Sequence, residues 1–327
     1  MGFFRNNSTH KKIYMKKVLI TGGSGTVGRA FINTFYDRYS FISYDRNKEK
    51  QATLQATFPA VKLITGSIEN KEELINTFST IRPDIVIHAA ALKYIDIAEK
   101  QPSLAIKINV LGSMNIIDAA RIVNVPITIG ISSDKACLSN SIYGHTKNLM
   151  EHLFLEANDE KNKFIICRFC NVAGSYGSVI SRWLDLKSEN KTLKITDPKM
   201  NRFMFLPKDA ANLIQKAIEQ SENHLDTGIV IKKVKAVNMF DLASCISNNI
   251  EIIGKRAGER LNETLISVDE IPFTKIQNEY VLIQREKNTM NDSLDKELNS
   301  FDAERMSIGE MNNLLKNIEC AHEKCIN

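Results

Sequence analysis

The stretch Lys17-Val-Leu-Ile-Thr-Gly-Gly-Ser-Gly-Thr-Val-Gly28 decides the fold of this chain. A short apolar run leads directly into a turn with the spacing Gly22-x-x-Gly25-x-x-Gly28, and a helical pattern follows the turn. Glycines at this spacing let the backbone turn tightly, and the helix N-terminus that follows attracts a phosphate group. The stretch therefore predicts a first strand, a dinucleotide-binding turn and a first helix.

Short apolar runs continue to alternate with helical patterns, such as the one over residues 109–122. The runs read as strands at 18–20, 41–44, 61–64, 85–87, 127–131 and 164–169. Strand–helix alternation predicts an α/β fold with a doubly wound parallel sheet of the Rossmann type and right-handed crossovers. After about residue 175 the pattern becomes less regular, which predicts a smaller C-terminal substrate-binding lobe.

The domain organisation expected from these patterns has four parts. Residues 1–16 are polar and basic, lack the continuous apolar core of a signal peptide, and read as a disordered leader. Residues 17–175 form the dinucleotide-binding domain, and residues 176–285 form a substrate-binding lobe interleaved with it. Residues 286–327, rich in Asn, Glu, Lys and Asp, form a polar helical tail.

The composition narrows the class of protein. A net charge of +5 on 327 residues is mild and scattered, which argues against a nucleic-acid partner. Six cysteines in a chain of this length do not make a disulfide scaffold, and Cys167 and Cys170 lie in an apolar run as core residues. No apolar run approaches the ~20 residues that span a bilayer. We expect a cytoplasmic protein with no metal site and no membrane segment.

The end of the second predicted strand leaves the choice of dinucleotide open. Asp45 would accept hydrogen bonds from the adenosine ribose, which favours NAD. Arg46 and Lys50 could instead hold a 2′-phosphate, which favours NADP. The small residues after the fourth strand, in His88-Ala-Ala-Ala91, let a flat cofactor ring lie against the backbone. His88 itself reads as a packed or hydrogen-bonded histidine.

The segment Ser132-Ser-Asp-Lys-Ala136, followed by Tyr143 and Lys147, carries the chemistry. A Tyr and a Lys four residues apart lie on one face of a helix, where the ammonium favours the phenolate. Such a pair, together with Ser133, predicts the oxidation of an alcohol.

The adjacent Asp134-Lys135 pair adds a second reaction. Once carbon 4 of a sugar is a ketone, the proton on carbon 5 becomes acidic. A base can then remove this proton while an acid protonates the departing hydroxyl on carbon 6. Neighbouring residues of opposite charge can supply both functions if their pKa values are set apart. The pair therefore favours a dehydration.

These features together resemble the UDP-N-acetylglucosamine 4,6-dehydratases of the extended short-chain dehydrogenase/reductase superfamily, in particular the short soluble inverting type of the pseudaminic acid and capsule-sugar pathways. The resemblance runs from residue 17 to about 280. Its motifs are His88-Ala-Ala-Ala-Leu-Lys93 with Ala98-Glu99, Asn109-Val-Leu-Gly112, Ser132-Ser-Asp-Lys-Ala136, Tyr143-Gly-His-Thr-Lys147, Asn171-Val-Ala-Gly-Ser175, Thr196-Asp-Pro-Lys-Met-Asn-Arg-Phe203 and Arg256-Ala-Gly-Glu259.

The resemblance implies a reaction and a set of catalytic residues. Tyr143, Lys147 and Ser133 serve oxidation at carbon 4, Lys135 is the base at carbon 5, and Asp134 is the acid for the carbon 6 hydroxyl. Hydride return to carbon 6 and proton return to the opposite face of carbon 5 give an inverted UDP-4-keto-6-deoxy sugar. The cofactor is NADP, with NAD as the alternative, and stays tightly bound because it is recycled.

The resemblance also implies binding residues, a UDP-sugar substrate and a homo-oligomer. The residues expected to bind the cofactor are Gly22, Ser24, Gly25, Thr26, Val27, Gly28, Asp45, Arg46, Lys50, Ser67, Ile68, Ala89, Ala90, Ala91, Asn109, Tyr143 and Lys147. Those expected to contact the sugar or the UDP are Lys93, Asn171, Ser178, Val179, Arg202, Arg256 and Glu259.

The chain departs from the family pattern at four positions. Asp45 replaces a small residue, Ser67 stands where an Asp contacts adenine, and Ser139 stands where a Pro is usual. Tyr176 replaces an Arg near the substrate, which leaves the final product open. The alternatives are a 5,6-dehydratase that releases a 5,6-unsaturated UDP-sugar, a UDP-sugar 4-epimerase, and a non-catalytic dinucleotide-binding protein.

Overall fold

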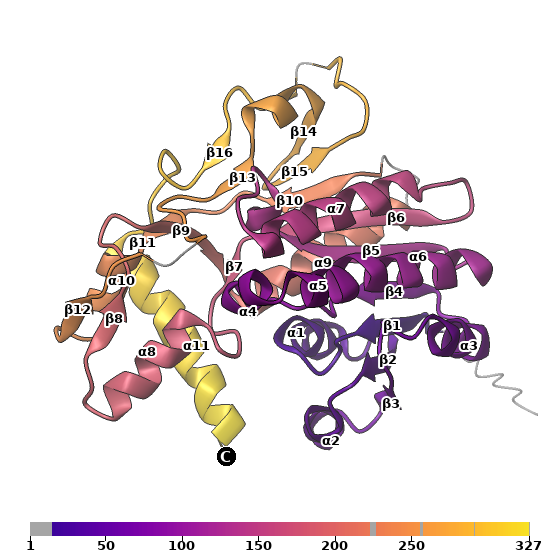
Figure 1. Cartoon of the computed structure of the whole chain (residues 1–327), viewed down its shortest axis with the longest axis horizontal. Coiled ribbons are helices and arrows are strands. Elements are labelled where there is room, and N and C mark those ends of the chain that lie inside the picture. The colour runs from indigo at the N-terminus through magenta and orange to yellow at the C-terminus, as the bar shows by residue number, and fades with distance from the viewer. Residues whose placement is uncertain (1–14, 223–226, 256–257, 291, 327) are drawn as a thin grey trace, which may run out of the picture.

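A nine-stranded sheet forms the centre of the molecule (Figure 1). The computed structural model describes residues 15–222, 227–255, 258–290 and 292–326. The strands of the main sheet are β1 (Lys17–Thr21), β2 (Ser40–Asp45), β3 (Lys62–Thr65), β4 (Ile85–His88), β5 (Ile127–Ser133), β6 (Lys163–Phe169), β10 (Ile229–Lys232), β14 (Thr274–Gln277) and β15 (Tyr280–Ile283). Their order is β14-β15-β10-β6-β5-β4-β1-β2-β3. Neighbours from β3 to β10 are parallel, and β15 and β14 continue the sheet antiparallel.

Helices cover both faces of this sheet (Figure 1). The α-helices are α1 (Thr26–Phe35), α2 (Lys48–Thr57), α3 (Lys71–Ile81), α4 (Ile95–Lys100), α5 (Pro102–Ala105), α6 (Gly112–Ile122), α7 (Ile142–Glu156), α8 (Val179–Ser188), α9 (Pro207–Glu222), α10 (Met239–Ser244) and α11 (Ile308–Ile326). Helices α3, α6 and α7 pack in a row on one face, and α1 packs against α9 on the other. The doubly wound α/β fold expected from the sequence is confirmed, as are the six strands predicted before residue 175.

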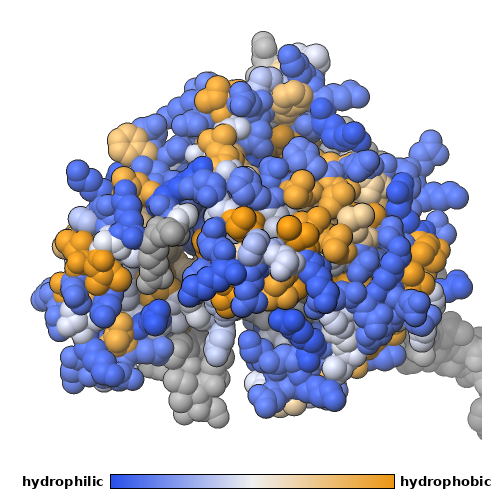
Figure 2. All heavy atoms as spheres, viewed as in Figure 1, coloured by the Kyte–Doolittle hydropathy of each residue, from blue (hydrophilic) through white to orange (hydrophobic). Residues whose placement is uncertain are grey.

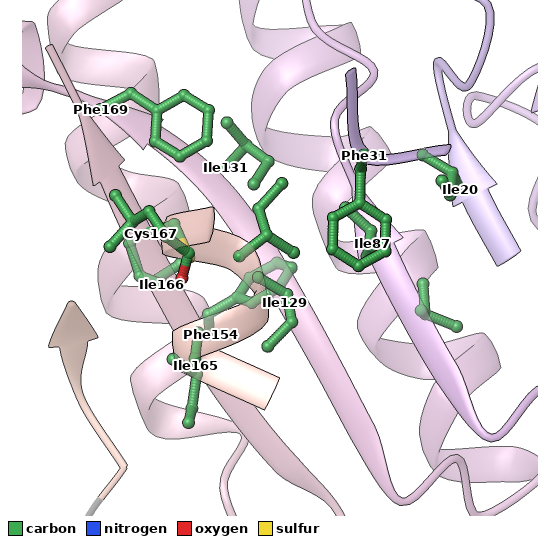
Figure 3. Close-up of a cluster of buried hydrophobic side chains, with 14 of the residues drawn as sticks. Ile20, Phe31, Ile87, Ile129, Ile131, Phe154, Ile165, Ile166, Cys167 and Phe169 are labelled. Carbon is green, nitrogen blue, oxygen red and sulfur yellow. The ribbon is translucent and has the colours of Figure 1, made fainter. Parts of the chain in front are cut away.

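Side chains from the central strands fill the space between the sheet and its helices (Figure 3). Ile129 and Ile165 are fully buried, as are Phe31 of α1 and Phe154 of α7, which belong to helices on the two faces. The strands are parallel and covered on both sides, so they are apolar throughout instead of alternating. Each such side chain contributes roughly 1.5–3 kcal/mol by burial, which fixes the strand ends that carry the polar site.

The smaller lobe contains three short sheets and its own apolar cluster. Its strands are β7 (Asn171–Val172), β8 (Leu193–Ile195), β9 (Asn201–Phe205), β11 (Ala236–Asn238), β12 (Ile250–Ile252), β13 (Thr264–Ile266) and β16 (Leu298–Asn299). They pair as β11-β9-β7, β12-β8 and β13-β16. The main-sheet strands β10, β14 and β15 also come from residues after 175, so the chain crosses between the lobe and the sheet.

The C-terminal helix α11 differs from the polar tail that composition suggests. Its Met311, Leu314, Leu315 and Ile318 are buried in the apolar cluster of the smaller lobe. The helix is amphipathic, and the polar residues that dominate the composition lie on its exposed face. None of the helices in the described part of the chain is long and apolar enough to cross a membrane.

The crossovers change direction between β1 and β4. In an open α/β sheet, such a switch point leaves a crevice at the carboxyl ends of the strands. The glycine-rich turn follows β1, Asp45 ends β2, and residues 89–91 follow β4. Residues predicted to bind the cofactor are thus brought to one edge of the sheet.

Candidate active site

A cleft of about 500 Å³ opens at this switch point. All the predicted cofactor-binding residues line it except Gly28 and Asn109. The predicted catalytic residues Ser133, Asp134 and Lys135 line its inner end. The described residues contain no group of three or more His, Cys, Asp or Glu side chains that could hold a metal ion.

The glycine-rich turn fits closely against the loop after β4. Gly22 has φ +69°, and a Cβ atom there would lie 3.0 Å from the Ala90 nitrogen. A side chain at this position would therefore push the two loops apart. Gly28 lies behind the turn, because a Cβ there would be 2.5 Å from the Gly23 carbonyl oxygen, and its absence lets α1 pack onto the turn.

Asp45 is held at the rim of the cleft next to the glycine-rich turn. The Ser24 hydroxyl donates to its Oδ2 at 2.5 Å, and the Asn47 backbone nitrogen donates to its Oδ1 at 3.1 Å. The side chain of Arg46 is 68% exposed and lies 4.0 Å from Glu69. The cation that follows Asp45 in sequence is therefore directed to another carboxylate.

Two buried polar residues support the cleft from behind. His88 pairs with Thr21 (Nδ1 to Oγ1, 2.8 Å) and with Ser113 (Nε2 to Oγ, 3.0 Å). Burial lowers the pKa of His88 to about 3, with a further contribution from Lys147, so the ring is neutral and structural as expected. Asn109 lies in a π-helix, η1 (Ile106–Leu111), and its side chain binds both the N–H and the carbonyl of Leu92.

The acid–base candidates form one hydrogen-bonded cluster at the end of β5 and in the 3₁₀ turn η2 (Asp134–Ala136). The Ser133 hydroxyl donates to Asp134 Oδ1 at 2.9 Å, and Lys135 Nζ donates to the same oxygen at 3.0 Å. Asn171 contacts both members of the pair, with Nδ2 3.5 Å from Asp134 Oδ2 and Oδ1 3.4 Å from Lys135 Nζ. Asp134 is buried, so its carboxylate interacts with these groups instead of water.

Tyr143 and Lys147 lie one turn apart on the buried face of α7, as their spacing predicts. Burial raises the pKa of the Tyr143 phenol above its ordinary value, while Lys135 and a hydrogen bond with Ser133 lower it. Burial lowers the pKa of Lys147 to about 8, against the attraction of Glu151, and its Nζ lies 3.1 Å from the Met150 sulfur. In this arrangement the cation that favours the phenolate is Lys135, whereas the sequence pattern assigns that effect to Lys147.

A second cavity of about 350 Å³ adjoins the cleft and shares Lys93, Lys135 and Asn171 with it. The remaining predicted substrate-binding residues that line it are Ser178, Val179, Arg202 and Glu259. Arg256 lies outside the described residues. The two cavities meet at Lys135, so a substrate in one can present a reacting carbon to a cofactor in the other.

The polysaccharide biosynthesis protein family matches residues 18–285. The chain belongs to this family. It is 35% identical over 280 residues to a UDP-N-acetylglucosamine 4,6-dehydratase (inverting) from Campylobacter jejuni, which covers 82% of both chains. The resemblance inferred from the sequence motifs is therefore confirmed.

Solved structures share the fold. Pen from Bacillus thuringiensis is similar with a TM-score of 0.85 and 28% identity, covering 93% of this chain and 97% of that one. A UDP-glucose 4-epimerase from Thermus thermophilus, solved in complex with NAD, has a TM-score of 0.65 and 18% identity, covering 74% and 88%. At this identity the second likeness shows the fold alone.

In this member of the polysaccharide biosynthesis protein family, Arg202 is already engaged by backbone. Its Nη1 donates to the carbonyls of Asn201 at 2.8 Å and Leu261 at 3.0 Å, and its Nη2 donates to that of Arg260 at 2.7 Å. Arg202 therefore contributes mainly a fixed positive charge to the cavity, because backbone carbonyls already accept from its Nη1 and Nη2 groups.

One buried carboxylate of the site is absent from the sequence predictions. Glu263 lines the second cavity, and its Oε1 lies 3.7 Å from Lys135 Nζ. The only sequence signal is its place directly before the short apolar run Thr264–Ile266, where a carboxylate is unusual. Its distance of more than one hundred residues from Lys135 in sequence hides the contact.

Proposed function

We propose that the protein is a UDP-N-acetylglucosamine 4,6-dehydratase, a hydro-lyase that forms a UDP-4-keto-6-deoxy sugar. The observation that carries this proposal is the Asp134–Lys135 pair, 3.0 Å apart beside Ser133 at the junction of two cavities. Oxidation alone requires a residue such as Tyr143, whereas removal of water also requires an acid and a base. The name of the Campylobacter jejuni relative supports the same reaction.

The protons of the water-loss step balance within the pair. Tyr143 takes the proton of the carbon 4 hydroxyl, with Ser133 hydrogen-bonded to the same oxygen. The Lys135 ammonium then passes a proton to the Asp134 carboxylate, which gives an amine and a carboxylic acid. The amine removes the carbon 5 proton, the acid protonates the departing hydroxyl as water, and the pair returns to its starting charges. Proton return to the opposite face of carbon 5 gives the inverted product.

We infer that the recycled cofactor is NAD and not NADP. When bound, the nicotinamide accepts a hydride from carbon 4 and returns it to carbon 6. Gly22 and Gly25 line the cleft with backbone that carries no side chain, which fits the pyrophosphate of a dinucleotide. A 2′-phosphate would meet the carboxylate of Asp45, and Arg46 is directed to Glu69. These contacts favour NAD, the alternative that Asp45 suggests, over NADP, which the family resemblance implies.

The second cavity suits the UDP part of the substrate. Helix α8 begins at its wall, where the Ser178 side chain caps the helix by accepting from the Ser181 nitrogen. A helix N-terminus attracts phosphate groups, and Lys93 and Arg202 add positive charge to the same cavity. We propose that the diphosphate lies here and that the sugar reaches toward Lys135.

Incubation of the purified protein with UDP-N-acetylglucosamine tests the proposal. The product should be lighter by one water without added cofactor, and NMR of a product made in deuterated water should show deuterium at an inverted carbon 5. An unchanged mass with altered stereochemistry would establish a 4-epimerase. A vinylic carbon 6 signal would establish a 5,6-dehydratase, and retained cofactor without turnover would establish a binding protein.

We further propose that the protein acts as a homo-oligomer. An apolar patch lies over α7 and over α6 with the preceding η1 (Figure 2), and its exposed side chains include Ile106, Leu111, Met114 and Leu149. Soluble monomers seldom leave several large apolar side chains exposed together. A second copy related by a two-fold axis would cover this patch with the same patch.

A further inference from the structure

Glu263 brings a second carboxylate to Lys135. Its Oε1 lies 3.7 Å from Lys135 Nζ, next to Asp134 Oδ1 at 3.0 Å and Asn171 Oδ1 at 3.4 Å. A lysine ammonium has three N–H donors, and these three oxygens surround it. The flexible Lys135 side chain is thereby directed from three elements toward the junction of the two cavities.

The backbone fixes the position of Glu263. Its N–H donates to Ser300 Oγ at 2.9 Å, and its carbonyl accepts from the Ser300 N–H at 2.9 Å. The Ser300 hydroxyl in turn donates to the carbonyl of Asn201 at 3.2 Å. These bonds tie the Glu263 backbone to the β13–β16 pair and to β9, and so fix the point from which its side chain reaches Lys135.

The charge of Glu263 requires an explanation beyond stability. Only 5% of the residue is exposed, and Arg202 Nε is 3.9 Å from the same Oε1. Separations of 3.7 and 3.9 Å are ion-pair distances, longer than hydrogen bonds. Buried ion pairs contribute little net stability, because each charge loses its hydration. A buried carboxylate held near a reactive lysine therefore points to a role in the chemistry.

We propose that Glu263 is a positioning residue of the water-loss step: its carboxylate holds the Lys135 amine at the cavity junction and sets how readily it gives a proton to Asp134. This inference rests on the proposed dehydratase function. Glu263 acts through Lys135 and completes a cluster of two cations and two carboxylates with Asp134 and Arg202.

The charges around Lys135 agree with this role. Burial alone would lower the pKa of Lys135, but Asp134 and Glu263 raise it above its ordinary value, and Arg202 opposes them. Tyr143 and the Cys170 thiol also face Lys135. Glu263 thus keeps Lys135 charged in the resting site and prevents the premature loss of its proton to solvent.

The Glu263→Gln variant tests the contact directly, through the rate at which an amine-directed reagent modifies Lys135. Only the neutral amine reacts with the reagent. Loss of a negative charge about 4 Å away lowers the pKa of a lysine by about one pH unit or more, which raises the neutral fraction at a given pH. Modification of Lys135, measured by peptide mass spectrometry relative to exposed Lys191, should rise at least about tenfold at a fixed alkaline pH. The kcat for water loss should fall at least about tenfold with little change in KM.

Two further variants keep the test decisive. Glu263→Asp keeps the negative charge. The rate of Lys135 modification should therefore stay near that of the wild-type protein, and kcat should fall less than in Glu263→Gln. Glu279→Gln removes one of two carboxylates near Lys232, the exposed one at 3.4 Å, and should change neither readout. An unchanged Lys135 modification rate in folded Glu263→Gln protein, or a raised KM with unchanged kcat, would overturn the proposal. If the wild-type protein does not remove water from UDP-N-acetylglucosamine, the dehydratase function is rejected instead. The lysine modification assay does not depend on that function, so the two failures can be distinguished.

Discussion

At the scale of single residues, the pKa values of two lysines in the site shift in opposite directions, and Lys147 is buried while the Lys135 side chain is 18% exposed. Burial lowers the pKa of Lys147 to about 8, while carboxylates raise the pKa of Lys135 above its ordinary value. Lys135 is the cation that lowers the pKa of Tyr143. The group that we propose as the base for water loss would therefore also assist the proposed oxidation at carbon 4.

Replacement of Lys135 by Met should separate the two half-reactions. Water loss should become undetectable, because no base reaches carbon 5. Oxidation at carbon 4 should persist but move to higher pH, since Tyr143 loses the cation that lowers its pKa. Rapid-mixing absorbance of the reduced nicotinamide measures this step, and Lys191→Met, which removes a surface lysine, is the control. Loss of both steps in a folded Lys135→Met protein would show that the oxidation depends on Lys135.

His88 should make the protein less stable at mildly acidic pH. Its pKa is about 3 in the folded protein, against the ordinary value of 6.5 in an unfolded chain, so the unfolded chain binds the extra proton between these values. The free energy of unfolding should therefore fall as the pH drops below this ordinary value, by up to about 1.4 kcal/mol per pH unit. Between about pH 7 and about pH 5, His88→Asn should reduce this loss by roughly 2 kcal/mol.

Urea denaturation at the two pH values measures the effect of His88. Exposed His152 on α7 provides the control, because His152→Asn makes the same substitution without changing a buried site. Equal pH dependence in His88→Asn and the unmodified protein would contradict a buried neutral His88.

At the scale of elements, α11 supports a turn of the active site. Gly174 has φ +69°, and a Cβ atom there would lie 2.8 Å from Ile318 Cγ2. The turn after β7 continues into Ser178 and the start of α8, which line the second cavity. A helix far from the catalytic cluster in sequence thus holds one wall of the substrate site.

Truncation of Ile318 should therefore affect both stability and substrate binding. Ile318 is 4% exposed, and Ile318→Ala should lower the free energy of unfolding by about 2 kcal/mol or more. Ile308, on the same helix, is 68% exposed, and Ile308→Ala should cost less than about 0.5 kcal/mol. Urea denaturation and KM for the sugar nucleotide measure the two effects. Equal stability of the two variants would contradict a supporting role for α11.

Local sequence pattern predicts the helices and strands in which apolar residues form a clear run or repeat at regular spacing. The strands β1 to β6 follow from apolar runs alone. The helix predicted at 109–122 is preceded and begun by the π-helix η1, in which the Asn109 side chain binds the Leu92 backbone. The hairpin β14–β15 does not follow from local pattern, since its place depends on pairing with β10.

The same limit applies to the site. The Asp134–Lys135 pair and the Tyr143/Lys147 pair are close in sequence, so spacing alone predicts each pair. Glu263 reaches Lys135 only through the β13–β16 pair, which no local period indicates. Contacts between distant segments thus account for the one proposed positioning residue that the sequence does not reveal.

At the scale of the whole molecule, one buried charge network joins the sheet to the smaller lobe. Arg168 of β6 pairs with Glu151 of α7 at 2.7 Å and with Glu270 of the 3₁₀ turn η3 (Val268–Phe273) at 2.8 Å. Its Nη1 also donates to the Leu265 carbonyl of β13 at 2.8 Å. Glu151 lies one turn beyond Lys147, so the network links α7 to β13, the strand that directly follows Glu263.

The apolar patch over α6 and α7 predicts the oligomeric state. Two copies joined through this face would bury Met114 at the contact, so a charge there would be desolvated without a partner. We expect the unmodified protein to elute with a dimer's mass or more in size-exclusion chromatography with light scattering at micromolar concentration. Met114→Glu should elute as a folded monomer, because the side chain is exposed in a single copy. Phe301→Glu, at another exposed apolar site, should leave the mass unchanged. A monomeric wild-type protein would contradict the proposed oligomer. An oligomeric Met114→Glu variant would show that the contact between copies lies elsewhere.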